Sequence, residues 1–245
     1  MRSILRTTGR RMAGFLPRRD YPVLSGPLFG ARFVLGSFAG DGGGVSVFFN
    51  RSEPEQVLEF AATVKAGNTV LDIGANVRLY SILASRRAGP SGRVYAFEPA
   101  PRNIQFLNRH IKLNRAENVF VVEAACGRQV GEADFFPGPN SAMGSLQKVG
   151  GDKFRVTAIT IDQFVLAEKI SPDVIKIDVE GAELDVIYGA ENTLSRSRPV
   201  IFLSTHSPGL RRECLERLAE FGYSYRPISG GDDPNEFILF AGGNG

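Results

Sequence analysis

The segment Val70-Leu71-Asp72-Ile73-Gly74-Ala75-Asn76-Val77 decides the fold of this chain. An apolar strand runs here into a turn with a glycine, and a helical pattern follows over residues 79–87. In an open α/β sheet, a strand–turn–helix unit of this kind binds a nucleotide at the carboxyl end of its strand. The segment therefore predicts a nucleotide or nucleoside cofactor. The alternative is a local role, in which Asp72 caps the helix and Gly74 only makes the turn.

Short apolar runs alternate with longer helical patterns on both sides of this segment. We expect strands at Thr69–Ile73, Arg93–Phe97, Val119–Val122, Val174–Ile177 and Val200–Leu203, and helices over 79–87, 101–114, 182–194 and 209–221. Fully apolar strands are typical of a parallel sheet that is buried on both faces. Two further strand-like segments, Tyr223–Ile228 and Glu236–Phe240, close the chain. We therefore predict an α/β fold with a Rossmann-like, doubly wound sheet that is mostly parallel and has an antiparallel C-terminal strand.

The pattern divides the chain into three parts. Residues 1–24 form a basic N-terminal extension, residues 25–52 a β-rich preface or lid, and residues 53–245 the main domain. In the preface, apolar runs at Phe33–Leu35 and Val45–Phe49 flank a glycine-rich turn at residues 40–44, which favours a hairpin. A helix is expected to begin near Ser52 or Glu53 and to end near Gly67.

Positive charge is concentrated at the N-terminus. Residues 1–20 hold six of the 29 Lys and Arg residues and one of the 26 acidic residues, which leaves 23 basic and 25 acidic residues elsewhere. A body without basic excess argues against a nucleic-acid partner. Apolar residues between Ile4 and Leu16 repeat at helical spacing among the arginines. Three interpretations are open: an amphipathic helix in peripheral contact with an anionic membrane, a loosely docked terminus, and a transit-type leader.

The cysteines and the hydropathy pattern predict a cytoplasmic protein. Cys126 and Cys214 are far apart and match neither a metal-binding pair nor a disulfide framework. The sequence has no apolar run of the roughly 20 residues that a membrane-spanning helix requires and no secretory signal.

The first segment favours S-adenosylmethionine over NAD. Dinucleotide sites use G-x-G-x-x-G because the backbone must approach a pyrophosphate, whereas this turn has only Gly74 and carries Asp72. An acidic residue repels phosphate but suits the ammonium and sulfonium groups of S-adenosylmethionine. Glu98 follows the next strand, 24 residues after Gly74, where a carboxylate can accept hydrogen bonds from both ribose hydroxyls. Its alternative is a solvated residue or a helix cap.

A third segment, residues 174–183, places acids at the same edge of the sheet. Asp178 and Glu180 follow a buried strand, and they can orient an acceptor hydroxyl, take its proton or hold a divalent metal, although no metal site is predicted. Glu180 and Glu183 can instead be ordinary helix N-terminal acids. His206 follows the fifth strand and is a third candidate for the base, unless it is structural.

These segments together resemble the FkbM family of methyltransferases. The family's D-x-G-A-N turn, later F-E-P and K-I-D-V-E-G-A-E appear here at Asp72–Asn76, Phe97–Pro99 and Lys176–Glu183, within a resemblance that covers roughly residues 50–205. The resemblance implies a class I methyltransferase fold, S-adenosylmethionine as donor, and O-methylation of a sugar, glycan or natural-product hydroxyl. By the same resemblance, Asp72, Gly74 and Asn76 line the methionine end of the cofactor, Glu98 binds the ribose, and Asp178 and Glu180 lie near the acceptor.

The chain departs from the family pattern at two places. The pattern usually continues G-A-N-x-G, but Arg78 replaces the second glycine, so that Arg78 either pairs with the cofactor carboxylate, points to solvent or obstructs the pocket. The alternative function is therefore a catalytically silent methyltransferase-fold protein that binds a ligand or partner. Many class I enzymes also carry an acid near the adenine amine, where this chain has Ala124 and Ala125, so Ala125 is expected to contact adenine through its backbone and methyl group.

The acceptor pocket is expected to come from variable loops, here residues 25–52 and 137–153. The predicted partner is a small-molecule or glycan acceptor, and the sequence gives no indication of the oligomeric state.

Overall fold

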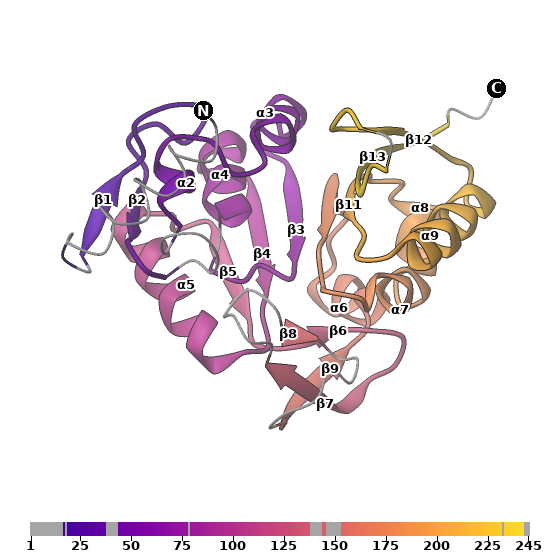
Figure 1. The fold of residues 1–245 in the computed structure, drawn as a ribbon. Coiled ribbons are helices and arrows are strands. Elements are labelled where there is room, and N and C mark those ends of the chain that lie inside the picture. Colours follow the sequence, from indigo (N-terminus) through magenta and orange to yellow (C-terminus); the bar gives the residue numbers. More distant parts are fainter. Residues whose placement is uncertain are drawn as a thin grey trace.

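The fold is a single large sheet with helices on both faces, seen in a computed structural model. The structure describes residues 17, 19–37, 44–77, 79–137, 144–145, 153–231 and 233–242. In this part of the chain the central sheet has the strand order β12-β13-β11-β10-β3-β4-β5 (Figure 1). Its parallel strands are β3 (Thr69–Ile73), β4 (Arg93–Phe97), β5 (Val119–Val122), β10 (Val174–Ile177) and β11 (Val200–Ser204).

The C-terminal strands β12 (Tyr223–Pro227) and β13 (Glu236–Ala241) run antiparallel to their neighbours. The predicted mostly parallel sheet with an antiparallel C-terminal strand is thus confirmed. From β3 the chain builds outward through β4 and β5 on one side, and later through β10 and β11 on the other. The strand order therefore reverses between β3 and β10, and in α/β sheets the ligand crevice lies at such a reversal.

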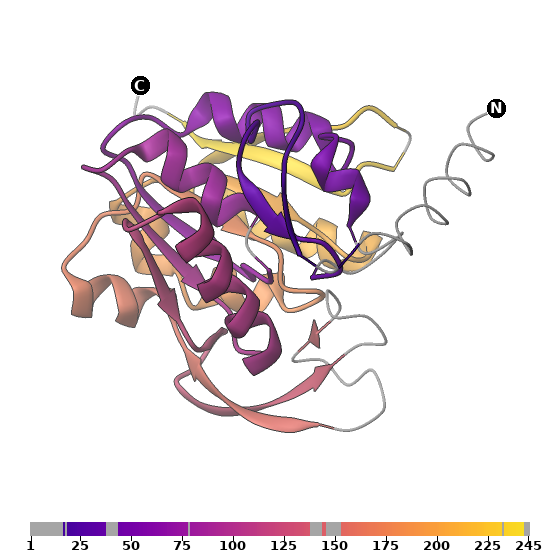
Figure 2. The same cartoon turned by 90° about the vertical axis from the view of Figure 1, so that its left-hand side faces the viewer.

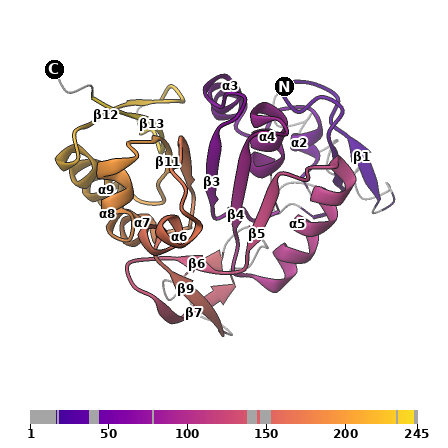
Figure 3. The same cartoon turned by 180° about the vertical axis from the view of Figure 1, so that it is seen from behind.

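Two groups of helices cover the two faces of the sheet (Figures 1 and 3). One group consists of α3 (Pro54–Thr63), α4 (Leu79–Ala88) and α5 (Pro101–Asn114), and the other of α6 (Ile161–Glu168), α7 (Glu183–Tyr188), α8 (Glu191–Arg196) and α9 (Pro208–Glu220). Successive strand residues point to opposite faces. Accordingly, Val70 packs in the core on the α3–α5 side, while Leu71 and Ile73 pack in the core on the α7–α9 side.

The prediction of one continuous helix over residues 182–194 is wrong. The segment forms two short helices, α7 and α8. Between them, the carbonyl of Gly189 accepts a hydrogen bond from the N–H of Asp162 at 2.9 Å. This carbonyl is therefore not part of the hydrogen bonds within a helix. The carboxylate of Asp162 then accepts from the backbone N–H groups of Asn192 and Thr193 at 2.9 and 2.7 Å. Asp162, from α6, therefore caps the start of a new helix.

The strand predicted at Val45–Phe49 is also wrong, because this run is the helix α2 (Val45–Phe48). One helical turn buries Val47 and Phe48 in the core on the α3–α5 side, and this packing overrides the strand preference of the residues. The strand β2 (Arg32–Val34) pairs instead with β1 (Asp20–Pro22), and the pair lies on the side of the sheet that α4 and α5 cover (Figure 2).

This β1–β2 pair is fixed to α5 by polar contacts. The N–H of Val34 donates to Nε2 of the buried His110 at 2.7 Å, and the N–H of Arg32 donates to Asn114 Oδ1 at 2.8 Å. His110 therefore has a structural role, as a histidine in the middle of a helix suggests.

A small second sheet, absent from the predicted elements, lies at the carboxyl end of β5. It has the order β6-β9-β7-β8, with β6 (Ala125–Cys126), β7 (Gly131–Pro137), β8 (Gly144–Ser145) and β9 (Phe154–Ile159). Figure 1 shows it below the central sheet, between α5 and α6. No helix in the described ranges combines the length and the apolar character that crossing a bilayer requires.

Candidate active site

The crevice is built where the turn after β3 packs against the turn after β10. Gly74 has a φ of +81°, and a Cβ at this position would lie 1.9 Å from the carbonyl oxygen of Asp178. The N–H of Asp178 donates to the carbonyl of Ile73 at 3.0 Å. Gly74 is therefore required both for its backbone conformation and for the close approach of the two turns.

A first cleft, called here the Glu98 cleft, opens beside this contact and encloses about 500 Å³ of empty space that is open to solvent. Its walls come from the ends of β3, β4, β5 and β10. They include Gly74, Asn76, Glu98, Asn103, Ala125, Asp178 and Glu180. The apolar part of the wall includes Phe97, Pro99, Ala124, Cys126, Phe135, Val179 and Ala182.

Glu98 is buried and holds the turn that carries Asn76. Its Oε2 accepts from the N–H of Asn76 at 2.8 Å, and its Oε1 accepts from the N–H of Ala100 at 2.9 Å and from Nδ2 of Asn103 at 3.2 Å. Burial raises the pKa of Glu98, although these hydrogen bonds oppose the shift. In contrast, Asn76 Oδ1 is buried and has no hydrogen-bond partner in the described part of the chain. Asn76 thus lines the cleft and carries an acceptor atom that the described residues leave unpaired.

A second cleft, called here the Tyr80 cleft, adjoins the first and encloses about 830 Å³ of empty space, open to solvent. Gly74, Asn76, Asp178 and Glu180 line both clefts. The other walls of the Tyr80 cleft come from α2, the start of α3, β3, α4 and β10, and they include Ser46, Ser52, Glu53, Asp72, Tyr80 and Lys176. Part of the predicted acceptor segment 25–52 thus lines this cleft, whereas most of 137–153 lies outside the described residues.

Lys176 is a fully buried cation at the base of the Tyr80 cleft. It stands opposite Asp72 in the register of β10 and β3, so both side chains point to the same face of the sheet. Its Nζ lies 2.8 Å from Asp178 Oδ2 and 4.5 Å from the centre of the Tyr80 ring. Burial alone would lower the pKa of Lys176, but the charges of Asp178 and Asp72 outweigh it and raise the pKa. Lys176 therefore stays positively charged.

Asp72 is equally buried, and its Oδ2 accepts from the hydroxyl of Ser81 at 2.5 Å. Burial raises the pKa of Asp72, against the lowering effects of Lys176 and Ser81. The structure thus places Asp72 at the wall of the Tyr80 cleft, held by α4 and β10.

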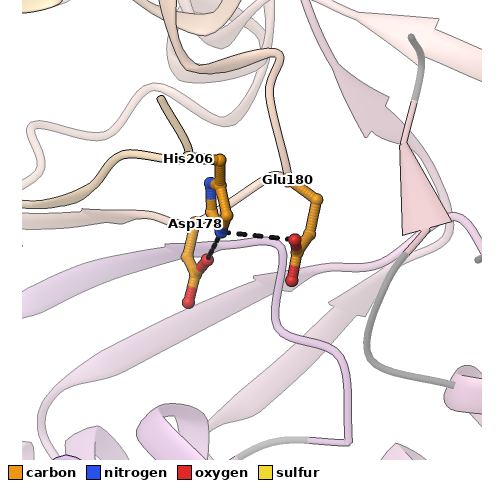
Figure 4. Close-up of side chains that lie close together, drawn as sticks. All are labelled: Asp178, Glu180 and His206. Carbon is orange, nitrogen blue, oxygen red and sulfur yellow. Dashed lines mark ion pairs between the residues drawn. The ribbon is translucent and has the colours of Figure 1, made fainter. Parts of the chain in front are cut away.

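His206 lies between the carboxylates of Asp178 and Glu180, as Figure 4 shows. Its Nε2 is 3.6 Å from Asp178 Oδ1 and 3.3 Å from Glu180 Oε2, while its Nδ1 is 2.8 Å from Glu183 Oε1. Glu183 has no exposed surface, and its Oε1 also accepts from the N–H of Gly181 at 3.0 Å. The imidazole is therefore held by α7 and directed at the two carboxylates.

The electrostatic field at this cluster is negative. Burial would lower the pKa of His206, but the hydrogen bond to Glu183 and the charges of Asp178 and Glu180 raise it to about 9. Burial raises the pKa of Glu180, and that of Asp178 is lowered because Lys176 and His206 outweigh its burial. Among the described residues, five acidic side chains meet two basic ones in this part of the crevice: Glu53, Asp72, Asp178, Glu180 and Glu183 against Lys176 and His206.

The structure brings most of the predicted residues together. Gly74, Asn76, Glu98 and Ala125 line the Glu98 cleft, Asp72 lines the Tyr80 cleft, and Asp178, Glu180 and His206 form one cluster. Their assigned roles stay predictions. Arg78 lies outside the described residues, as does the helical pattern of residues 4–16.

Sequence reasoning missed two residues that shape the cluster. Lys176 is a lone cation in an otherwise apolar strand, and that anomaly is a signal for a buried ion pair. Glu183 was assigned only as a possible helix N-terminal acid, because nothing in the local pattern links it to His206, 23 positions later.

Comparison with known proteins agrees with this architecture. A family model described as "Methyltransferase FkbM domain" matches residues 72–225. The hexuronic acid methyltransferase AglP of Haloferax volcanii is 26% identical over 153 residues, covering 62% of this chain and 62% of its own length. The methyltransferase sdnD of Sordaria araneosa is 25% identical over 193 residues, covering 65% of this chain and 74% of its own.

A solved structure of methyltransferase FkbM from Methylobacillus flagellatus has the same fold, with a TM-score of 0.53 and 17% identity. The match covers 80% of this chain and 53% of that one. This chain therefore spans less than two thirds of both that structure and the Haloferax relative. Methyltransferase activity is common to the family model and to both of the named relatives.

Proposed function

This chain belongs to the FkbM methyltransferase family, and from that premise we propose that it uses S-adenosylmethionine to methylate a hydroxyl oxygen of a sugar, glycan or natural product. The observation that carries the proposal is the crevice at the strand-order reversal between β3 and β10. There, two adjoining clefts share Gly74, Asn76, Asp178 and Glu180. One cleft fits a nucleoside, the other fits a polar acceptor, and the shared wall is where a methyl group passes between them.

The residues present fit the cofactor. Asn76 Oδ1 lacks a partner within the described residues and suits the ammonium group of the methionine moiety. Oε2 of Glu98 accepts one hydrogen bond, from the N–H of Asn76, and so keeps a second acceptor position for a ribose hydroxyl. Ala124, Ala125 and Cys126 offer an apolar wall for the adenine ring.

The negative charge of the crevice favours S-adenosylmethionine over a dinucleotide. The sulfonium and ammonium groups of S-adenosylmethionine are attracted by a crevice in which, among the described residues, acidic side chains outnumber basic ones. A pyrophosphate in the Glu98 cleft would instead lie among Glu98, Asp178 and Glu180. The same negative field opposes an NAD-dependent function.

The transfer is a displacement in line at the methyl carbon. The acceptor oxygen forms a bond to that carbon while the carbon–sulfur bond breaks, and the electron pair of the broken bond stays on sulfur. Alignment of the two reactants supplies much of the rate enhancement in such a step. The hydroxyl proton passes to Asp178 or Glu180, which stand at the wall shared by both clefts, and His206 holds these two carboxylates in place.

The Tyr80 cleft suits an acceptor rich in hydroxyl groups. Ser46, Ser52 and Glu53 from the preface and the start of α3 line it, and such side chains both donate to and accept from sugar hydroxyls. A sugar-acid acceptor, as named for the Haloferax relative, belongs to the same chemical class.

The first test is calorimetric titration of the full chain with S-adenosylmethionine, S-adenosylhomocysteine and NAD. We expect binding of both sulfur nucleosides and none of NAD. Binding of NAD alone would overturn the cofactor assignment. Absence of all binding would support the alternative, a silent protein whose pocket Arg78 obstructs, and Arg78→Gly should then restore affinity.

The second test identifies the atom that is methylated. The protein is incubated with S-adenosylmethionine carrying a labelled methyl group and a panel of sugars, uronic acids and polyketides. A labelled product that survives mild alkali is a methyl ether, as proposed. A product that alkali cleaves is a methyl ester and would overturn the assignment to a hydroxyl oxygen.

A further inference from the structure

We propose that Asp178, Glu180 and His206 bind one divalent metal ion where the clefts of the crevice meet. The three ligand atoms lie within 4.8 Å of one another. The geometry of these side chains supports binding of the ion and does not depend on the proposed function. Its part in catalysis rests on the proposed function.

The spacing of the ligand atoms fits a single ion. His206 Nε2 is 3.3 Å from Glu180 Oε2 and 3.6 Å from Asp178 Oδ1. Two atoms that each lie about 2.1 Å from an ion are about 3.0 Å apart at an octahedral angle and about 3.4 Å apart at a tetrahedral one. Both distances from His206 are therefore close to those of ligands on one ion, and the oxygens of Asp178 and Glu180 lie within 4.8 Å of each other.

The contact between Glu183 and His206 supports the metal site independently of the ligand spacing. Glu183 is fully buried and fixes Nδ1 of the imidazole at 2.8 Å, which leaves Nε2 directed at Asp178 and Glu180 (Figure 4). A metal-binding histidine commonly makes this contact, because a carboxylate on one ring nitrogen fixes the ring and increases the basicity of the other. The second oxygen of Glu183 has no hydrogen-bond partner in the described part of the chain. A wholly buried carboxylate thus orients the imidazole, and the N–H of Gly181 holds that carboxylate in place.

The ligand types indicate which ions fit. Two carboxylates and one imidazole suit Mn²⁺, Mg²⁺ or Zn²⁺, whereas ions that prefer thiolates find no sulfur in this set. Two carboxylates also neutralise the charge of a divalent ion. Mn²⁺ accepts both ligand types and is the natural probe.

The site leaves room for further ligands. Asp178 and Glu180 face the Glu98 and Tyr80 clefts, and Glu180 and His206 also line a third cavity, which opens beside Ser207 and Gly209. The protein therefore supplies ligands from one side, as catalytic metal sites do. A sugar hydroxyl bound at the open side would be more acidic, and its proton would pass, as in the proposed function, to a carboxylate oxygen of this pair that the ion leaves free.

The test is a titration of the full chain with Mn²⁺, followed by electron paramagnetic resonance in the absence of any cofactor. We expect one saturable site whose electron spin echo shows modulation by an imidazole nitrogen. His206→Gln should abolish this modulation and weaken Mn²⁺ binding at least tenfold, and Glu180→Gln should weaken binding at least tenfold while the modulation remains. Asp178 is left intact because Lys176 is paired with it.

Glu213→Gln is the matched control, because Glu213 is an exposed acid in the same third cavity but lies outside the triad. Its Mn²⁺ affinity should equal that of the wild type. No saturable binding, or equal weakening in the Glu213 variant, would overturn the proposal. Calorimetry with S-adenosylhomocysteine on the same samples reports the cofactor site separately, so that failure of the proposed function and failure of the metal site are distinguishable.

Discussion

Nδ1 of His206 lies 2.8 Å from Oε1 of Glu183, a carboxylate with no exposed surface. The two residues come from different elements, since Glu183 begins α7 and His206 follows β11. The contact fixes the plane of the imidazole. It therefore decides what Nε2 can reach, which is the pair of carboxylates at the wall of both clefts.

Glu183→Gln should weaken Mn²⁺ binding by about 10- to 100-fold, because an amide holds the imidazole less firmly and does not increase its basicity. Affinity for S-adenosylhomocysteine should not change, since Glu183 does not line the Glu98 cleft. Asp185→Asn, at a half-buried acid on the same helix that pairs with Arg128, is the control and should leave both affinities unchanged. Equal loss of both ligands in the Glu183 variant would mean that this residue only supports the fold.

Gly74→Ala should be much more destabilising than Gly30→Ala. Both glycines have a left-handed backbone, with φ of +81° and +79°, but the added Cβ meets nothing within 4 Å at Gly30 and lies 1.9 Å from Asp178 O at Gly74. The backbone penalty, about 1–2 kcal/mol, is common to both variants. Urea unfolding should show an additional loss of about 1–3 kcal/mol for the Gly74 variant, from the forced separation of the two turns. Equal stabilities would contradict the tight packing of β3 and β10.

Glu98→Gln should weaken S-adenosylhomocysteine binding about tenfold or more. The amide lacks the negative charge of the carboxylate and has one acceptor oxygen in place of two at the ribose position. The substitution keeps the shape of the side chain, which matters because Glu98 also holds the turn at Asn76. Glu123→Gln removes an exposed acid just before the Ala124–Cys126 wall and serves as the control. Calorimetry measures both variants. Unchanged affinity in Glu98→Gln would remove this residue from the cofactor site.

Glu236→Gln should stabilise the protein above pH 7 and have little effect near pH 4.5. Burial, reinforced by the charge of Glu53, raises the pKa of Glu236 from 4.5 to about 7. The folded state therefore keeps a proton that the unfolded state loses between these values, so stability from this group falls as the pH rises from 4.5 to 7. The amide has no such proton to lose. Unfolding in urea at several pH values measures the difference, and a constant difference at every pH would contradict the prediction.

Elements with a strong local pattern were predictable from the sequence. The apolar strands at Thr69–Ile73 and Val174–Ile177 are found as predicted, since burial on both faces leaves little choice of side chain. Elements that depend on distant partners were not predictable. The run Val45–Phe48 has strand-forming residues but forms a helix, because Val47 and Phe48 fill a core built by α3 to α5.

The sequence by itself determined which residues reach the edge of the sheet. Parallel strands end at one edge, so Asp178, Glu180 and His206 had to lie near one another and near Gly74 once the strands were recognised. How these groups are paired depends on the packing of the folded chain. The register that sets Lys176 beside Asp72, and the packing of α7 that sets Glu183 behind His206, join residues 104 and 23 positions apart. Such contacts depend on how elements pack in three dimensions, and no local pattern along the chain specifies them.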